Sequence, residues 1–349
     1  MSLIHIALSC DDNYVVPTGV TIQSVIANRA PTTQLHFHIM LFEVSVANHQ
    51  ALESFAGPDV QVSLIDVRAE DFPNCQVKEG VYWTLPVWFR LRYATFFPEI
   101  DKILALDSDM IIREDLTPLW DTDISDVYVA AVPSGQDPDE VAQYLNLPRI
   151  KGICLNPATS LMNLRKFRED NIEQKCFDFL NANYARLHFN EEDILNNVLQ
   201  DQRRPISSRW NRMPLDFYAR LGKESYRKLK AEQEEAAILH FGCRSKPWHG
   251  NCEHPLRDEY LKYLLQTPWK DQAAAIRRDQ FWNKIWSVTV YPERIRYRLF
   301  GFTILERFRS AKRDSYTGSL NVLSVPVFSK STDYQTGQTQ IRILGIRVR

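Results

Sequence analysis

The chain has 349 residues, of which 44% are hydrophobic and 24% charged, and its formal net charge is −1. This composition excludes a disordered or collagen-like chain and predicts a globular protein with a large core, built as two units or as one large domain with an appendage. No apolar run approaches the roughly 18 residues of a spanning helix, and residues 1–9 lack the pattern of a secretory signal. Six cysteines without CxxC spacing favour reduced thiols, so we expect a cytoplasmic protein.

Charge is distributed unevenly along the chain. From Lys270 onward there are 15 Lys and Arg against 6 Asp and Glu, a net of +9, whereas the preceding part has 27 against 37, a net of −10. Such a basic segment suits docking to an anionic surface, either a phospholipid membrane or a phosphorylated glycolipid, although a solvated pair of surface helices explains the same count. Nucleic acid is not an expected partner, because the segment lacks dense interleaving of basic and aromatic residues.

Strands and helices alternate from the first residue. Apolar periodicity predicts buried strands over 3–8, 35–41 and 60–65, with helices over 17–30 and 46–55 between them. This order predicts a parallel sheet covered by helices, with the ligand at the carboxyl ends of the strands. Further expected elements are helices over 85–97, 171–181, 255–265 and 273–286 and strands over 102–106, 127–132 and 153–164, the last interrupted by Asn156-Pro157.

One strand ends in two carboxylates. After the apolar run 102–106 come Asp107, Ser108 and Asp109, and a second apolar run follows. In an extended segment Asp107 and Asp109 share a face and can hold one divalent cation, although the same pattern also describes a turn cap after a strand. A cation site is favoured because an apolar strand rarely ends in adjacent carboxylates unless something neutralises them.

Three further segments carry residues that could complete such a site. Either Arg90 or Arg92, in the helix over 85–97, would suit a diphosphate, although an arginine there is also typical of a side chain that reaches back to solvent. The acidic residues 191–193 open an apolar helix, where first-turn carboxylates complement the helix dipole even without another role. His240 ends a strand and is followed by Lys246 in a turn fixed by Pro247, so imidazole and ammonium can face one anion; alternatively the histidine is structural.

A weak repeat closes the chain. Short apolar runs begin at Leu299, Val322 and Ile343, at spacings of 23 and 21 residues, and each has Gly or Ser third. We expect these runs to be the strands of hairpins in a small β-rich appendage, because the repeat does not continue long enough along the chain to form a solenoid.

Taken together, these segments resemble family 8 glycosyltransferases, the retaining GT-A fold class that includes bacterial lipopolysaccharide galactosyl- and glucosyltransferases and glycogenin. The resemblance covers residues 1 to about 260 and rests on seven pieces in the family's order. They are Cys10 to Tyr14, Phe89-Arg90-Leu91, Leu106 to Asp109, Leu116 to Trp120, Asn156 with Met162-Asn163-Leu164, Glu192 to Asn196, and His240 with Lys246-Pro247-Trp248.

The resemblance implies a role for each matching residue. Asp107, Asp109 and His240 would ligate the cation, and this mixed set suits Mn²⁺ better than Mg²⁺. Donor-binding positions would be Ser9, Cys10, Asp11, Asp12, Asn13, Tyr14, Arg90, Asp107, Ser108, Asn156, Cys243 and Lys246, with Asp11 to Tyr14 on the uracil and ribose of a UDP-sugar and Lys246 on its phosphates. Glu191, Glu192 and Asp193 would be catalytic.

The chain departs from the family pattern at several positions. Many relatives have Asp-Gln-Asp where this chain has Glu191-Glu192-Asp193, so Glu192 would place a carboxylate near the anomeric carbon. Relatives usually have Asn-Ala-Gly or Asn-Ser-Gly at 156–158 and Gly at 243. The family's sugar-recognising Asp has only Asp137 and Asp139 as candidates here. These changes beside the sugar pocket leave glucose and galactose both open as the donor.

The expected protein is therefore α/β, a GT-A Rossmann-like domain with a mostly parallel sheet over 1–260. It is followed by a helical, basic segment over 261–298 and a short β-repeat tail over 299–349 for membrane or acceptor docking. The expected activity is retaining transfer of a hexose from a UDP-sugar to a bacterial cell-surface glycan such as lipopolysaccharide core, at the inner face of the plasma membrane. The alternative is a weak or silent relative that serves as a UDP-sugar-binding or scaffold subunit.

Overall fold

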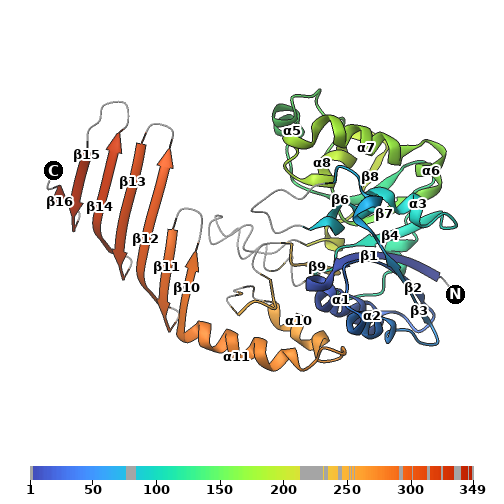
Figure 1. Ribbon diagram of the computed structural model, residues 1–349, viewed down its shortest axis with the longest axis horizontal. Helices are drawn as coiled ribbons and strands as arrows, with labels where there is room; N and C mark the ends of the chain where they lie inside the picture. Colours follow the sequence, from blue (N-terminus) through green and yellow to red (C-terminus); the bar gives the residue numbers. More distant parts are fainter. Residues whose placement is uncertain are drawn as a thin grey trace. The chain divides into compact units, whose positions relative to one another are not determined.

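A computed structural model describes residues 3–75, 84–212, 231, 235–242, 246–250, 252, 254, 256–290, 294–300, 302–312, 315–323, 325–333, 339–344 and 346–347. The chain divides into two compact units (Figure 1). The first comprises Met1–Arg244 with Asp258–Lys270, and the second comprises Ser245–Arg257 with Asp271–Arg349.

The first unit is organised around a sheet of seven strands in the order β3-β2-β1-β4-β7-β6-β8. Its strands are β1 (Leu3–Asp11), β2 (Gln34–Phe42), β3 (Val60–Asp66), β4 (Lys102–Leu106), β6 (Val129–Pro133), β7 (Leu155–Asn163) and β8 (Arg203–Pro205). The first four in chain order pair in parallel, β7 runs antiparallel to both β4 and β6, and β8 is parallel to β6. The mostly parallel sheet predicted from the β-α-β-α-β order is therefore present.

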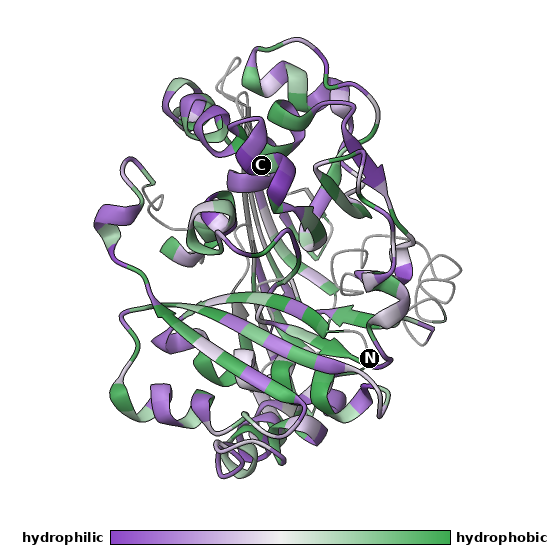
Figure 2. Cartoon of the chain, turned by 90° about the vertical axis from the view of Figure 1, so that its right-hand side faces the viewer, coloured by the Kyte–Doolittle hydropathy of each residue, from purple (hydrophilic) through white to green (hydrophobic). Residues whose placement is uncertain are grey.

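Helices cover both faces of this sheet. One apolar core joins alternate residues of β1 and β2 to helices α1 and α2, and the other joins the opposite face to the helices that follow β3. Figure 2 shows the apolar residues running along the strands of this sheet. The helices are α1 (Val15–Asn28), α2 (Val46–Glu53), α3 (Tyr93–Phe96), α4 (Thr117–Trp120), α5 (Pro138–Leu145), α6 (Leu164–Glu169), α7 (Ile172–Asn183), α8 (Asn190–Leu199) and α10 (Arg257–Leu264), with 3-10 helices at Asp12–Tyr14, Ala69–Asp71, Leu85–Arg92, Tyr184–Arg186 and Ser208–Trp210.

Two expected elements differ in the structure. The predicted helix over 85–97 is instead a 3-10 helix, Leu85–Arg92, followed by the short α3. Pro86 lies in the first turn of this helix, where its missing N–H would have had no partner in any case. The apolar composition of the segment is compatible with a tighter 3-10 helix as well as with an α-helix. Asn156-Pro157 does not interrupt its strand. Both residues lie within β7, and a register shift opposite Ala131 and Val132 accommodates them.

The second unit contains α11 (Gln272–Ile285) and an antiparallel sheet in which consecutive strands are neighbours (Figure 1). Its strands are β10 (Trp286–Val290), β11 (Arg294–Leu299), β12 (Phe302–Lys312), β13 (Ser315–Val322), β14 (Val325–Asp333), β15 (Thr339–Ile343) and β16 (Ile346–Arg347).

The predicted β-rich appendage of hairpins is present, but each copy of the repeat spans a turn between two strands and is not a single strand. Each copy contains the end of one strand, a two-residue turn and the start of the next strand, because β11 ends at Leu299 and β12 begins at Phe302. The second residues of the copies, Phe300, Leu323 and Leu344, have φ of 47°, 48° and 49°. Gly or Ser after such a residue is typical of tight hairpin turns, and this outweighs the β-propensity of the apolar neighbours.

Among the described residues, none of the helices combines the length and apolar character needed to cross a membrane. The cysteines at 10, 75, 154, 176 and 252 are buried free thiols.

Candidate active site

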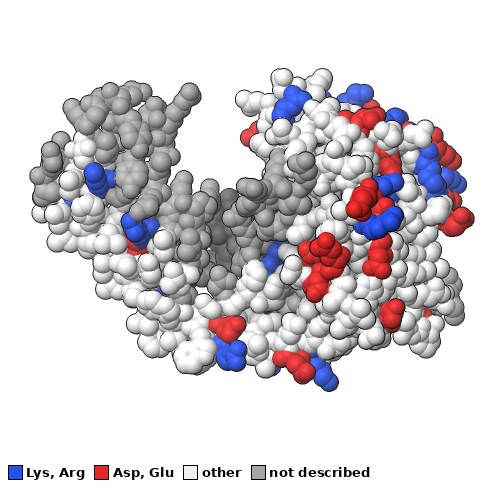
Figure 3. All heavy atoms as spheres, viewed as in Figure 1, with Lys and Arg blue, Asp and Glu red and all other residues white. Residues whose placement is uncertain are grey.

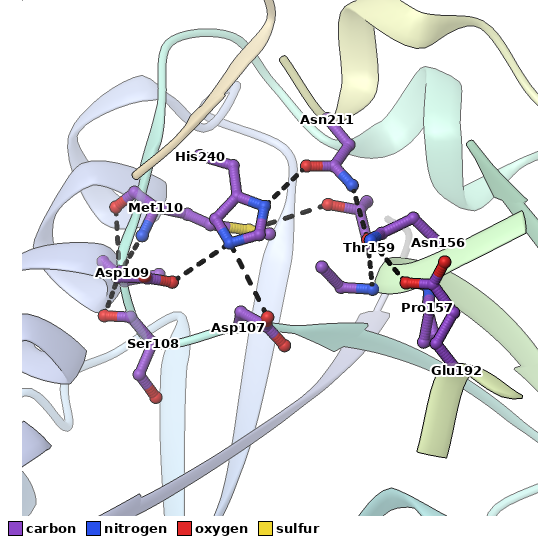
Figure 4. Close-up of polar contacts among 12 residues, drawn as sticks. Asp107, Ser108, Asp109, Met110, Asn156, Pro157, Thr159, Glu192, Asn211 and His240 are labelled. Atoms are coloured by element: carbon purple, nitrogen blue, oxygen red, sulfur yellow. Dashed lines mark hydrogen bonds and ion pairs between the residues drawn. The ribbon is translucent and has the colours of Figure 1, made fainter. Parts of the chain in front are cut away.

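Two short strands bring the predicted metal ligands together. β5 (Met110–Ile112) follows Asp109 directly and pairs antiparallel with β9 (Ile238–His240), so that Met110 lies opposite His240. The His240 Nε2 atom lies 3.3 Å from Asp109 Oδ1 and 3.7 Å from Asp107 Oδ2. The three side chains thus offer one ligand atom each within 4.8 Å of one another (Figure 4).

An asparagine orients the imidazole. His240 Nδ1 lies 2.8 Å from Asn211 Oδ1, and Asn211 Nδ2 donates to Asn156 Oδ1 at 2.9 Å. Because Asn211 presents its oxygen, His240 donates from Nδ1, and the lone pair of Nε2 faces the two carboxylates. This is the arrangement expected of a histidine that ligates a cation, so these residues fit a divalent ion.

Arg90 neutralises the other side of this carboxylate pair. The Arg90 side chain is buried, donates to Asp107 Oδ1 and to the Pro157 carbonyl, and its Nε lies 3.6 Å from Glu191 Oε1. Arg92 instead pairs with Glu173 at 2.8 Å and borders a separate hollow of about 530 Å³. Of the two arginines in this helix, Arg90 is therefore the one beside the candidate metal ligands.

Glu192 joins the same network from α8. Asn156 Nδ2 donates to Glu192 Oε2 at 2.9 Å, and Gln136 Nε2 donates to Glu192 Oε1. A chain of side-chain hydrogen bonds therefore runs from His240 through Asn211 and Asn156 to Glu192 (Figure 4). The two amides hold the imidazole and the carboxylate in a fixed relation.

Burial changes the acidity of the two glutamates. It raises the pKa of Glu192 to about 8, with a further contribution from the neighbouring Glu191 charge, while hydrogen bonds from Ser134 and Gln136 oppose the shift. Burial also raises the pKa of Glu191 to about 7, although Arg90 counteracts it. Two adjacent, buried carboxyl groups with raised pKa values beside a cluster of possible metal ligands are typical of a functional site.

Asp193 is placed differently from its two neighbours. Its Oδ1 accepts the Tyr144 hydroxyl at 2.5 Å, and its Oδ2 accepts the backbone N–H groups of His188 and Phe189 at 2.8 and 2.9 Å. One oxygen thus holds the loop before α8 and the other binds Tyr144 of α5, while the catalytic role of Asp193 stays a prediction.

The predicted nucleotide-binding stretch lies at the carboxyl end of β1, next to β4 in the sheet. Ser108 Oγ donates to the Ser9 carbonyl at 2.9 Å, which ties the two strand ends together. Asp11 accepts the backbone N–H of Tyr14 at 3.1 Å and caps the following 3-10 helix. Asn13 is exposed and Tyr14 half-buried, so both remain candidates for a ligand contact.

Two residues of this stretch serve the fold. Cys10 is buried in the apolar core beneath α1, and burial raises the pKa of its thiol to about 12. Side-chain alternation along β1 turns the Cys10 side chain inward, so the donor contact predicted at residue 10 stays a prediction for its backbone. Asp12 Oδ1 accepts hydrogen bonds from Ser45 and Asn48 at the start of α2, which lower the Asp12 pKa.

The structure describes some of the remaining predicted positions and not others. Lys246 is buried and belongs to the second unit, so its phosphate contact stays a prediction, and Cys243 lies outside the described residues. Asp137 caps α5, and Asp139 pairs with Arg149 at the surface.

Sequence analysis missed Asn211 and Gln136, the two amides that hold His240 and Glu192. Both lie in polar loops, where no periodicity indicates which side chain turns inward. The signal in the sequence for Gln136 is its position, because it immediately precedes Asp137, a candidate for the sugar-recognising residue.

Comparison with known proteins gives this geometry its context. The pattern of glycosyl transferase family 8 matches residues 5–252. General stress protein A of Bacillus subtilis (strain 168) is 26% identical over 284 residues, which cover 76% of this chain and 95% of that protein. The lipopolysaccharide 1,3-galactosyltransferase of Salmonella typhimurium (strain LT2) is 24% identical over 276 residues, which cover 76% of this chain and 79% of that protein.

Solved structures agree with the family match. The galactosyltransferase LgtC, in complex with donor and acceptor sugar analogues, has a TM-score of 0.65 at 25% identity, covering 77% of this chain and all of that chain. A structure of LgtC with an active-site glutamine changed to glutamate has a TM-score of 0.64 at 25% identity, covering 76% and 96%. The expected GT-A fold is thereby confirmed. Because the family pattern spans more than half of the sequence, this chain belongs to glycosyl transferase family 8.

Proposed function

We propose that this family 8 glycosyltransferase is a retaining, metal-dependent α-hexosyltransferase. It takes glucose or galactose from a UDP-sugar and extends a bacterial cell-surface glycan such as lipopolysaccharide core. One observation carries the proposal: Asp107, Asp109 and His240 converge on a single point, with Arg90 and the buried pair Glu191 and Glu192 beside it. The hexose and the acceptor follow the named activities of relatives such as the lipopolysaccharide 1,3-galactosyl- and 1,2-glucosyltransferases.

The donor set supports manganese as the cation, with magnesium as the alternative. Two carboxylates and one neutral imidazole mix hard and borderline ligands, whereas Mg²⁺ prefers oxygen alone. When bound, the cation would neutralise the diphosphate and the charge that develops as UDP departs. Arg90 pairs with the Asp107 carboxylate and fixes its position, and Asn211 holds His240 in the ligating tautomer.

Retention of the anomeric configuration constrains the chemistry. We favour attack on the face from which UDP departs: the acceptor oxygen bonds to the anomeric carbon as the bond from that carbon to the phosphate oxygen breaks. The acceptor hydroxyl proton then passes to the departing phosphate. The anomeric carbon becomes cationic in the transition state, and a carboxylate near it stabilises that charge.

We assign this stabilising role to Glu192. Asn156 and Gln136 hold its carboxylate through both oxygens, and its pKa of about 8 lets it ionise at mildly basic pH. Relatives commonly have glutamine in the corresponding motif, and a matched LgtC structure carries an active-site glutamine-to-glutamate change. The present chain would thus have by nature the carboxylate that was engineered there.

A screen of UDP-hexoses for metal-dependent hydrolysis tests the proposal. The purified full chain should slowly hydrolyse UDP-glucose or UDP-galactose with Mn²⁺ and lose this activity in EDTA. Asp109→Ala should abolish hydrolysis, whereas Asp201→Ala, which changes an exposed carboxylate paired with Lys151, should not. Absence of both turnover and calorimetric binding for every UDP-sugar would contradict the proposal.

The same screen addresses the alternative of a silent relative. The Pro157 and Ala158 departures motivate a UDP-sugar-binding or scaffold subunit, and binding of UDP without turnover would favour it. The intact cluster of three candidate metal ligands argues for the enzyme, because a relative that has lost catalysis usually loses its metal ligands first.

Mass spectrometry with donor alone separates two roles for Glu192. If Glu192 captures the sugar, wild type should carry a hexose adduct at residue 192 that Glu192→Gln lacks. If Glu192 only stabilises the transition state, neither protein should carry an adduct at residues 191–193.

We also place the enzyme in the cytoplasm, docked at the inner face of the plasma membrane. The acceptor class supports this, because lipid-linked saccharides are extended at that surface, and so does the net charge of +9 from Lys270 onward.

A further inference from the structure

The C-terminal sheet displays a row of apolar hairpin tips. The row consists of Phe300, Leu323 and Leu344, each flanked by paired apolar residues: Leu299 with Phe302, Val322 with Val325, and Ile343 with Ile346. The turns between β11 and β12, β13 and β14, and β15 and β16 all lie at one end of the meander (Figure 1).

Each tip is fixed by the preceding structure in the same way. The backbone N–H of Leu323 donates to the Ile304 carbonyl, and that of Leu344 donates to the Val327 carbonyl, both at 3.1 Å. The N–H of Phe300 donates to the Ile285 carbonyl at 2.7 Å. Because neighbouring tips are two strands apart, they lie about 10 Å from one another, and the row extends about 20 Å.

These tips are exposed rather than packed. Phe300, Leu323 and Leu344 are 67%, 66% and 66% exposed, and Phe302 and Ile346 reach 75% and 69%. A contiguous apolar row of this kind, repeated at regular intervals, marks an interaction surface.

Basic residues lie further along the strands from the hairpin tips. Arg342 lies two residues from its tip, about 7 Å along the strand, and Arg307 and Lys330 lie five residues beyond Phe302 and Val325, about 16 Å along theirs. All three are exposed. Residues 294–349 contain 11 Lys and Arg against 3 Asp and Glu, whereas both signs are interspersed on the face of the first unit seen in Figure 3.

We propose that the hairpin-tip row inserts into the interface of an anionic phospholipid bilayer. Apolar tips that penetrate about 5–10 Å would leave Arg342 at the level of the lipid phosphates, with Arg307 and Lys330 above them within the attraction of the anionic surface. A second copy of the chain fits less well, because it would bring the same net positive charge against this one. The inference deepens the membrane contact proposed above, but its chemistry does not depend on transferase activity.

Flotation with vesicles tests the row directly. The full chain should bind vesicles of phosphatidylglycerol and phosphatidylcholine and not those of phosphatidylcholine alone. The triple variant Phe300→Asn, Leu323→Asn, Leu344→Asn should bind more than tenfold more weakly. Asparagine tolerates positive φ, so the turns should be preserved. The control Val46→Asn, Ile153→Asn removes exposed apolar residues of the first unit and should bind as wild type does.

Three results would overturn the docking proposal. They are unchanged vesicle binding by the triple variant, no vesicle binding by wild type, and a wild-type dimer in sedimentation that the triple variant abolishes without any lipid effect. UDP-hexose hydrolysis without lipid separates the two proposals. If vesicle binding fails while hydrolysis is intact, only the docking proposal is contradicted. If the chain binds vesicles but does not hydrolyse UDP-hexoses, only the transferase proposal is contradicted.

An independent observation concerns three histidines at the opposite end of β1. His5 lies beside His36 in the parallel register, and His38 is two residues further along β2 on the same face. His5 Nδ1 and His38 Nε2 are 3.0 Å apart, and the three residues offer ligand atoms within 4.8 Å of one another. Burial lowers the pKa of all three, which favours the neutral imidazoles that a cation requires.

We infer that this histidine cluster binds a borderline divalent cation such as Zn²⁺, which three neutral imidazoles suit better than Mn²⁺. Calorimetry with Zn²⁺ on a chain carrying Asp109→Ala and His240→Gln isolates the cluster from the active site. One ion per chain should bind, His36→Gln should remove it, and His49→Gln, at a histidine paired with Asp66 elsewhere, should not. Absence of Zn²⁺ binding in the isolating background, or binding unaffected by His36→Gln, would contradict the inference.

Discussion

The two units of this protein both carry their distinctive residues at strand ends, but with opposite chemistry. In the first unit the ends of β4 and β9 gather buried carboxylates, an imidazole and amides in one hydrogen-bonded network. In the second unit the hairpin ends present exposed aliphatic and aromatic side chains. A buried polar network suits a small, charged ligand, whereas an exposed apolar row suits an extended surface.

The comparison teaches that the two functions are separable. Substitutions in the first network should change metal binding and catalysis and leave vesicle binding intact, whereas substitutions at the tips should do the reverse.

The largest effect is expected from Asp109→Ala. Loss of a direct ligand should lower Mn²⁺-dependent hydrolysis by more than about 100-fold, beyond the range typical of a residue that only orients a ligand. Vesicle binding should be unchanged. Parallel assays of hydrolysis and flotation check this prediction. Loss of both activities would indicate a fold defect and would contradict the idea that the two functions can be changed independently.

A smaller effect is expected from Asn211→Ala, which removes the acceptor that fixes the His240 tautomer. Metal affinity should fall about 10–100-fold, with the fold intact. Titration of hydrolysis with Mn²⁺ measures it, and excess metal should restore the rate. Asn181→Ala, which removes an exposed contact to Asn74, is the matched control. An unchanged Mn²⁺ requirement would show that Asn211 does not position the ligand.

Glu192→Gln should change how stability depends on pH. Since the folded pKa of Glu192 is raised from 4.5 to about 8, the folded chain holds more protons than the unfolded chain between these values. Its contribution to the free energy of unfolding is therefore present at low pH and lost as pH rises through that window. Glu192→Gln should gain stability relative to wild type as pH rises from about 5 to about 9. Denaturation in EDTA measures this, and a pH-independent difference would mean that Glu192 ionises normally.

The smallest effect on catalysis is expected from the triple tip variant. Without lipid, its UDP-hexose hydrolysis should match wild type within twofold or so, since no tip residue belongs to the polar network. A large loss would show that the second unit contributes to turnover in its own right.

Much of the fold follows from the sequence because apolar periodicity has a direct structural cause. The strands ending at Asp11 and Leu106 are recognisable from their apolar runs, and adjacent parallel strands bring their carboxyl ends to one edge. The convergence of Asp107, Asp109 and His240 was likewise expected, although only through the family resemblance, since no local pattern joins residues 130 positions apart.

Other features escaped prediction for physical reasons. Cys10 and Asp11 are adjacent and their side chains point to opposite faces of β1. The residue types alone do not show which of the two faces enters the core that contains the Cys10 thiol. Asn211 and Gln136 act through side-chain hydrogen bonds to residues far away in the sequence, which leave no periodic pattern. The apolar repeat predicts strands because aliphatic residues favour β-structure, whereas its Gly and Ser are typical of turns.

The central claim is that two carboxylates and one imidazole hold a single manganese ion for a nucleotide's diphosphate. Electron paramagnetic resonance of free Mn²⁺, titrated with protein and UDP, counts the bound ions directly. Wild type should bind one ion per chain, while Asp109→Ala and His240→Gln should each bind none at the same concentration. Full binding by either variant, or no binding by wild type, would contradict the account.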